Sequence, residues 1–195
     1  MQRQLTFRQY RGMDLTMLTG LLVVCESLIV LAATRWFPGE PYTLSLTAAV
    51  TAIVMVRWGL WGAIPAGLGA LAFCIASGAT AGQYLIYIGG NMLALLLARL
   101  VRGEGWQKVK GDALTALVYG AASALLMQLG RFLLACVLGT PPATAAGFIT
   151  TDTLSTLFAA LLVWIARRLD GVLEEQRHYL ARVREEMERE REQAG

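Results

Sequence analysis

Apolar residues form six stretches between residues 13 and 166, and most charged residues lie between or outside them. A helix needs roughly 20 mostly apolar residues to cross a bilayer. The second stretch is short, and Arg57-Trp58-Gly59 is expected to turn it into the third, where Pro65 should kink the helix. We therefore predict an all-α polytopic membrane protein with six transmembrane helices, at 13–34, 43–57, 60–78, 83–100, 112–138 and 148–166.

The distribution of charge predicts how these helices are oriented. Positive residues concentrate on the cytoplasmic side of membrane proteins. In the six-helix arrangement the loops of one side hold only Arg35, and the other side holds Arg3, Arg8, Arg11, Arg57, Arg99, Arg102, Lys108, Lys110, Arg167 and Arg168. Both termini are therefore expected in the cytoplasm. Residues 1–12 form a cytoplasmic N-terminal segment, 13–166 the transmembrane domain, and 167–195 a charged cytoplasmic helical tail.

The tail has two interpretations. Opposite charges four residues apart support a helix, at Arg182/Glu186, Arg184/Glu188 and Glu185/Arg189. A solvated extension of the sixth span is the simpler one. The second interpretation is a docking or coiled-coil segment. The apolar stripe that it would need is broken, and consists of Leu169, Val172, Leu180, Val183 and Met187.

A few polar residues lie inside the apolar stretches at a common depth. Glu26, Asn91, Gln128 and Arg131 come from three predicted spans. From the rise of an α-helix, all four lie roughly 10–15 Å below the outer surface. Charged groups are rare in hydrocarbon and usually pair or line a path. We therefore expect a cavity open to the outside, in which Glu26 and Arg131 neutralise each other.

Helical spacing adds three residues to this candidate substrate site. Tyr84, Tyr87 and Asn91 share one face of the fourth span, and Asp152 shares a face of the sixth with Ser155 and Thr156. Aromatic walls with a few amide and charged groups suit a small, partly planar solute.

Simpler explanations exist for each residue. Glu26 and Arg131 can form a purely structural ion pair, and the two tyrosines can belong to an interfacial belt. Asp152 can cap the sixth helix, while Asn91 and Gln128 can join helices by hydrogen bonds. Small residues spaced four apart, as at Gly62, Ala66, Ala70, Gly90, Ala94, Ala98, Gly120 and Ala124, are expected chiefly to let helices pack closely.

Composition excludes several classes of function. The net charge of +3 does not suggest nucleic acid as a partner, and the odd set of Cys25, Cys74 and Cys136 has no disulfide or metal-binding pattern. The one histidine, His178, lies in the tail, and no phosphate-binding GxxxxGK[ST] loop occurs. We therefore expect no enzyme activity, cofactor or metal, and uphill transport would need a partner or an ion gradient.

Two segments carry a resemblance to a known family. They are 57–64 (RWGLWGAI), followed by a glycine-rich helix, and 84–91 (YLIYIGGN). With the six spans they make residues 10–166 similar to the substrate-binding S component of an energy-coupling factor (ECF) transporter. The tail departs from the compact family pattern, and the first span offers Thr16/Gly20 and Ala32/Ala33 where the family often has AxxxA.

The resemblance implies a function and partners. An S component of the bacterial cytoplasmic membrane binds a vitamin or related micronutrient and associates with a membrane scaffold (T) protein and two cytoplasmic ATPases. Two other functions remain open. One is a membrane scaffold or sensor, such as an MreD-like cell-shape factor or a signalling input domain. The other is a self-contained secondary transporter or channel, for which no inverted repeat is visible.

Overall fold

A computed structural model describes residues 6–39, 43–100, 105–176, 179–182, 185 and 189. Within these residues the chain is helical, with no strand. The expectations for Arg3, Arg102 and His178, and for tail positions such as Arg184 and Glu186, lie outside the described residues. The all-α prediction is confirmed for the described part.

The predicted spans correspond to the following elements. In chain order they are α1 (Phe7–Trp36), α2 (Thr47–Trp58), the 3₁₀ helix η1 (Gly59–Gly62), α3 (Ala63–Ser77), α4 (Ala81–Asn91), the 3₁₀ helix η2 (Met92–Leu96), α5 (Leu97–Leu100), α6 (Gly105–Gly111), α7 (Ala113–Val137), α8 (Pro142–Ala145), α9 (Gly147–Thr150) and α10 (Thr153–Ala166).

Five helical stretches of the described chain are long and apolar enough to cross a membrane, namely Phe7–Trp36, Thr47–Ser77, Ala81–Arg99, Ala113–Val137 and Pro142–Ala166. They indicate a membrane-embedded protein. The second stretch is a hairpin, because a Cβ on Gly69 would meet the side chain of Thr47 and a Cβ on Gly62 that of Met55. Six crossings remain a prediction, since α2 has only 12 residues.

The start of the predicted second span was wrong. Residues 43–46 are not helical, and α2 begins only at Thr47. The kink expected at Pro65 was also wrong, because α3 runs without a break from Ala63 to Ser77. Pro65 lies in the first turn of α3, where a helix does not need the backbone N–H that proline lacks.

The longest helices bury one face and expose apolar side chains on the other, whereas α2 is buried almost all round. Along α1 the buried residues are Leu15, Thr19, Leu22, Glu26 and Val30, at helical spacing. Its exposed face carries Met13, Met17, Leu21, Val24, Leu28 and Leu31. A continuous exposed apolar face of this kind fits contact with lipid.

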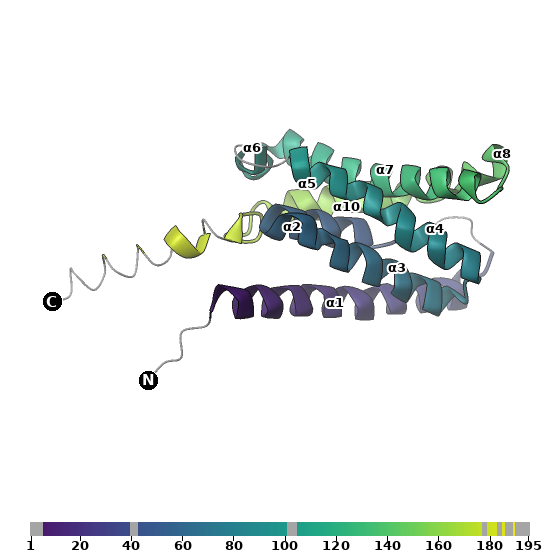
Figure 1. Cartoon of the computed structure of the whole chain (residues 1–195), viewed down its shortest axis with the longest axis horizontal. Helices are drawn as coiled ribbons and strands as arrows, with labels where there is room; N and C mark the ends of the chain where they lie inside the picture. The colour runs from purple at the N-terminus through teal and green to yellow at the C-terminus, as the bar shows by residue number, and fades with distance from the viewer. Residues whose placement is uncertain are drawn as a thin grey trace.

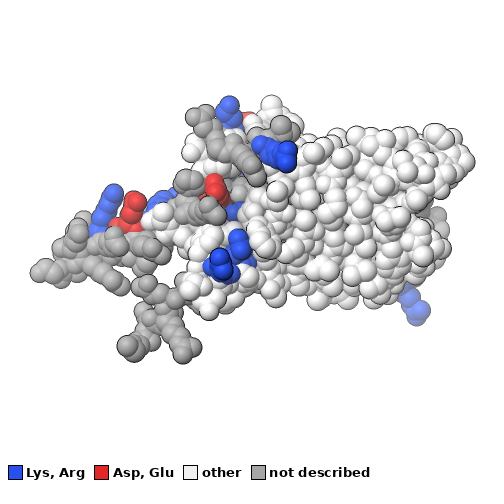
Figure 2. Space-filling view, viewed as in Figure 1, with Lys and Arg blue, Asp and Glu red and all other residues white. Residues whose placement is uncertain are grey.

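The bundle has α1 along one side and α7 with α10 on the other (Figure 1). Helix α1 packs mainly on α3, α4 lies against both α3 and α7, and α10 packs on α7 and α2. The start of α1 and the end of α10 lie at the same end of the bundle (Figure 1). Charged side chains gather at this end, called here the charged end, and almost none appear over the rest of the visible face (Figure 2).

Small residues allow the central helices to touch. Ala66, Ala70, Ala94, Ala98 and Ala124 are all buried. This confirms the expectation that these residues serve internal packing. The closest approach joins α4 and α7, where a Cβ on Gly130 would meet the carbonyl group of Gly90 and a Cβ on Gly90 would lie 2.5 Å from the backbone nitrogen of Arg131.

An ion pair between α1 and α2 organises the charged end. Arg57, counted above as a loop residue, is buried and donates to both carboxylate oxygens of Asp14 at 2.7 and 2.9 Å. The indole nitrogen of Trp58 donates to the same carboxylate. Arg57 also donates to the carbonyl oxygens of Gly171 and Val172, at 2.6 and 3.2 Å.

The tail does not continue α10 as a straight solvated helix. Helix α10 ends at Ala166, and residues 167–175 form turns, with Gly171 at φ +70°. Leu173, Glu174 and Gln176 are buried, and Gln176 accepts a hydrogen bond from Tyr10 of α1. The extension interpretation is therefore wrong for residues 167–176, which fold onto the bundle.

The contact between α4 and α7 gives a first test. Gly130→Ala places a methyl group against the backbone of Gly90, so we expect it to lower stability by about 1–3 kcal/mol, the usual cost of overpacking. Thermal unfolding in detergent measures this. Gly82→Ala is the matched control, since nothing lies within 4 Å of a Cβ there. Equal melting temperatures for the two variants would contradict the close packing.

Candidate functional site

Residues 43–46, called here the extended segment, precede the first turn of α2 and end at its N-cap, Leu46, so their backbone N–H groups have no partner within that helix. Polar side chains of α1 and α10 supply the partners. The backbone nitrogen of Leu46 donates to Glu26 Oε2 at 2.9 Å, and that of Ser45 donates to Ser155 Oγ at 2.9 Å. Non-helical backbone at membrane depth is tolerated only when it is paired or lines a cavity. Glu26 and Ser155 therefore hold this segment in place.

Thr43 joins the same segment to the start of α10. Its backbone nitrogen donates to the carbonyl oxygen of Thr151 at 3.1 Å, and its hydroxyl donates to Asp152 Oδ1 at 3.0 Å. Its own carbonyl oxygen accepts from Ser155 Oγ at 3.2 Å. Asp152 stands at the N-cap position of α10, but its side chain makes no capping hydrogen bond. Its role is the contact with Thr43 and with the arginine described next.

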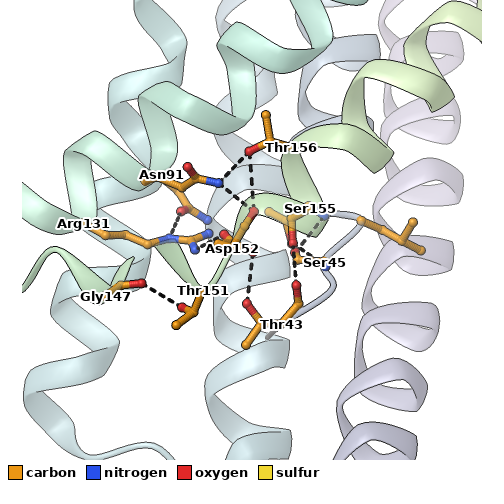
Figure 3. Close-up of polar contacts among 12 residues, drawn as sticks. Thr43, Ser45, Asn91, Arg131, Gly147, Thr151, Asp152, Ser155 and Thr156 are labelled. Carbon is orange, nitrogen blue, oxygen red and sulfur yellow. Dashed lines mark hydrogen bonds and ion pairs between the residues drawn. The ribbon is translucent and has the colours of Figure 1, made fainter. Parts of the chain in front are cut away.

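Arg131 of α7 lies between Asn91 and Asp152 (Figure 3). Its Nε donates to Asn91 Oδ1 at 2.9 Å, and its Nη1 forms an ion pair with Asp152 Oδ2 at 2.9 Å. All three side chains are buried. The ion pair expected between Glu26 and Arg131 is therefore not the one that forms, because Asp152 is the carboxylate in contact with Arg131.

The two amide side chains connect the helices around this pair. Asn91 Nδ2 donates to the carbonyl oxygen of Ala66 at 3.1 Å, which ties α4 to α3. Gln128 Nε2 donates to the carbonyl oxygen of Asp152 at 2.9 Å and to Thr156 Oγ1 at 2.8 Å, which ties α7 to α10. These side chains join α1, α4, α7 and α10 to the extended segment. We call them the polar cluster: Glu26, Thr43, Ser45, Asn91, Gln128, Arg131, Asp152, Ser155 and Thr156.

One of the two predicted tyrosines packs against the cluster and the other does not. The ring of Tyr87 lies 4.7 Å from the guanidinium carbon of Arg131 and packs against Phe73 and Phe148, with ring centroids 4.8 and 5.6 Å away. Within the described chain no hydrogen bond or ring contact connects the Tyr84 side chain to the cluster. Of the predicted site residues, Tyr84 alone lies apart.

The cluster encloses much less space than the open cavity predicted from the sequence. A small cavity between Thr47, Ala70, Tyr87 and Arg131 has a volume of about 10 Å³. This is about the space that one water molecule needs.

A separate groove of about 880 Å³, called here the large groove, lies between the end of α1, residues 37–39 and 43–44, α3 and Leu154. It shares Thr43 and Phe73 with the small cavity.

Sequence reasoning missed Thr43, Ser45 and Phe73, which contribute as much to this site as the predicted residues. The first two were assigned to a helix. The alternation of polar Thr43, Ser45 and Thr47 with leucines is a period of two, which is typical of an extended backbone. It was the signal that could have identified this segment.

The ion pair predicts a distinct pattern of stability. Asp152→Ala leaves the charge of Arg131 buried without a partner, so we expect a loss of about 3–5 kcal/mol. Adding Arg131→Met should recover most of that loss, because replacing both charges by apolar groups is often close to neutral. Thermal unfolding of the single and double variants in detergent measures the difference. A double variant as unstable as Asp152→Ala would contradict this role.

In the part of the chain that the structure describes, no group of three or more His, Cys, Asp or Glu side chains is close enough to hold a metal ion. Comparisons with models of protein families, with curated proteins and with solved structures find no match to this chain.

Proposed function

We propose that this chain is the substrate-binding membrane subunit for uptake of a vitamin-like micronutrient, and that it works with a membrane scaffold protein and two ATPases. The observation that carries the proposal is the large groove, which adjoins the polar cluster through Thr43 and Phe73. The resemblance to S components supplies the partners. On the predicted orientation, the groove opens at the outer end of the bundle.

The large groove has the size and lining of a small-molecule site. Its volume of about 880 Å³ is within the range for ligand pockets, which is about 300–1,000 Å³. Its walls are mostly apolar, with aromatic rings at Trp36, Phe37 and Phe73. A flat, partly apolar solute can lie here with its polar groups toward Thr43.

The cluster beneath the groove has hydrogen-bonding capacity that the protein leaves unused. Arg131 uses two of its five donors in the hydrogen bonds above. Glu26 Oε1, Thr47 Oγ1 and Gln128 Oε1 are buried without a hydrogen-bond partner in the described chain. Unsatisfied buried polar atoms are uncommon and often mark functional sites. These atoms can form hydrogen bonds with a solute that displaces the Phe73 side chain, which lines both the large groove and the small cavity.

The charges of the cluster restrict the kind of solute. Asp152 already matches the charge of Arg131 at 2.9 Å. A strongly acidic solute would have to displace this carboxylate, and removing one partner of a buried pair is costly. We therefore expect a solute with amide, carbonyl or hydroxyl groups rather than one with several acidic groups.

Filling the groove tests the proposal without altering the polar cluster. Ala33 lines the groove and is exposed, so Ala33→Trp should occupy it and leave the fold intact. Mass spectrometry of the purified wild-type protein should show a bound small molecule. In Ala33→Trp we expect its occupancy to fall at least tenfold, a loss of about 1.4 kcal/mol in binding.

The matched control is Ala143→Trp, an equally exposed alanine in α8 that does not line the groove. It should retain the molecule. Equal retention by Ala33→Trp and the control, with unchanged melting temperatures, would exclude the groove as the binding site. Absence of any bound small molecule from the wild-type protein in native lipid would count against the function itself.

A membrane scaffold or sensor is the second candidate function. The observation that favours it is the folding of residues 167–176 onto the charged end through Arg57 and Gln176. A sensor needs such a contact between its membrane and cytoplasmic parts. Co-purification of the full chain from its native membrane separates the candidates. ATPase subunits would support the transport subunit, and cell-wall or cytoskeletal proteins without ATPases would support the scaffold.

A further inference from the structure

A second groove lies between α1 and α3, away from the polar cluster. Its volume is about 530 Å³. Helix α1 contributes residues at helical spacing from Arg8 to Val23, and α3 with η1 contributes Trp61, Ile64 and Leu68. Apart from the two arginines at its mouth, the groove is lined almost wholly by apolar and small side chains. It shares no lining residue with the large groove or the small cavity.

The mouth of this groove carries positive charge without a negative partner. Arg8 and Arg11 stand three residues apart on α1, so they project from the same face. Among the described residues neither guanidinium forms an ion pair with a carboxylate. Arg11 lies over the ring of Trp61, with its guanidinium carbon 4.3 Å from the ring centroid. That contact fixes one cation at the mouth.

The apolar part of the groove has the length of one lipid chain. From Gly12 to Val23 is eleven residues, or about 16 Å along the helix axis. One leaflet contributes half of a hydrocarbon core of about 30 Å, which is about 15 Å. A Cβ on Gly12 or on Gly20 would meet nothing within 4 Å, so these glycines leave the groove open toward the bilayer.

We infer that this groove binds one anionic phospholipid. Its phosphate lies between Arg8 and Arg11, and an acyl chain follows the groove toward Val23. Basic groups beside a crevice between transmembrane helices suit anionic headgroups. The charge of the mouth selects an anionic lipid over a zwitterionic one, since only the former brings a net negative charge to the two arginines, which have no carboxylate partner among the described residues. This inference does not depend on the proposed transport function.

Native mass spectrometry of the full chain with added phosphatidylglycerol or phosphatidylcholine tests the inference. We expect the wild-type protein to retain phosphatidylglycerol in preference to phosphatidylcholine. Arg8→Gln and Arg11→Gln should each lower the phosphatidylglycerol affinity about fivefold, the effect of one basic side chain near an anionic surface. Arg35→Gln, at the other end of α1, is the matched control and should leave the affinity unchanged.

Filling the groove separates acyl-chain binding from general attraction to positive charge. Gly20→Leu should reduce binding of both lipids, while Gly82→Leu, another exposed glycine with nothing within 4 Å of a Cβ, should not. Lipid binding that is the same in Gly20→Leu and Gly82→Leu would overturn the inference. So would equal affinities for the two lipids, or a dimer in light scattering that Gly20→Leu dissociates, which would assign the groove to a second copy.

Discussion

The backbone of the extended segment is the constraint on which the centre of this structure depends. Thr43, Leu44 and Ser45 are not helical and Leu46 is the N-cap of α2, so the backbone N–H groups of this segment need partners from outside their own helix. The bundle supplies Glu26 from α1 and Ser155 from α10 instead. Asp152 then serves two groups, since one oxygen accepts from Thr43 and the other from Arg131. The buried polar residues of the cluster are therefore linked to the non-helical segment that precedes α2.

The close contact of α4 and α7 places Arg131 where this network needs it. Gly90 and Gly130 meet backbone to backbone, which brings Asn91 and Arg131, the residues that follow them, within 2.9 Å. Any side chain at Gly130 would separate the two helices. The packing of small residues and the polar cluster are thus parts of one arrangement, and the 3₁₀ segment from Met92 to Leu96 begins directly after Asn91. Such a segment within a longer helix often marks strain or function.

The sequence predicted the helices because long apolar stretches are a strong signal in a membrane protein. Of the seven predicted site residues, five belong to the polar cluster and Tyr87 packs against it, because polar positions are rare in such stretches. The prediction failed where the same stretch of sequence fits both a transmembrane helix and an extended segment. Residues 43–46 are apolar enough to read as a span, yet Thr43 and Ser45 pair with α10. The identity of each partner also escaped prediction. Depth placed Glu26 beside Arg131, but only the packing of α7 on α10 decides that Asp152 takes the ion pair. Arg57 was assigned to a loop because charge alone does not reveal Asp14 one helix away.

The two grooves differ in which of their chemical groups lack a partner within the protein. This difference is the reason why we propose different ligands for them. Beside the large groove Arg131 is already paired with Asp152, while hydrogen-bonding atoms such as Gln128 Oε1 have no partner in the described chain. At the mouth of the second groove, Arg8 and Arg11 form no ion pair with a carboxylate among the described residues. A buried site with unmatched dipoles favours a polar, uncharged solute, because any added charge would be costly there. An exposed site with unmatched cations favours an anion that stays near water. In both grooves the proposed ligand supplies the partner that the protein does not. That partner is a neutral hydrogen-bonding group of a micronutrient in the large groove and the negative charge of a lipid in the second groove.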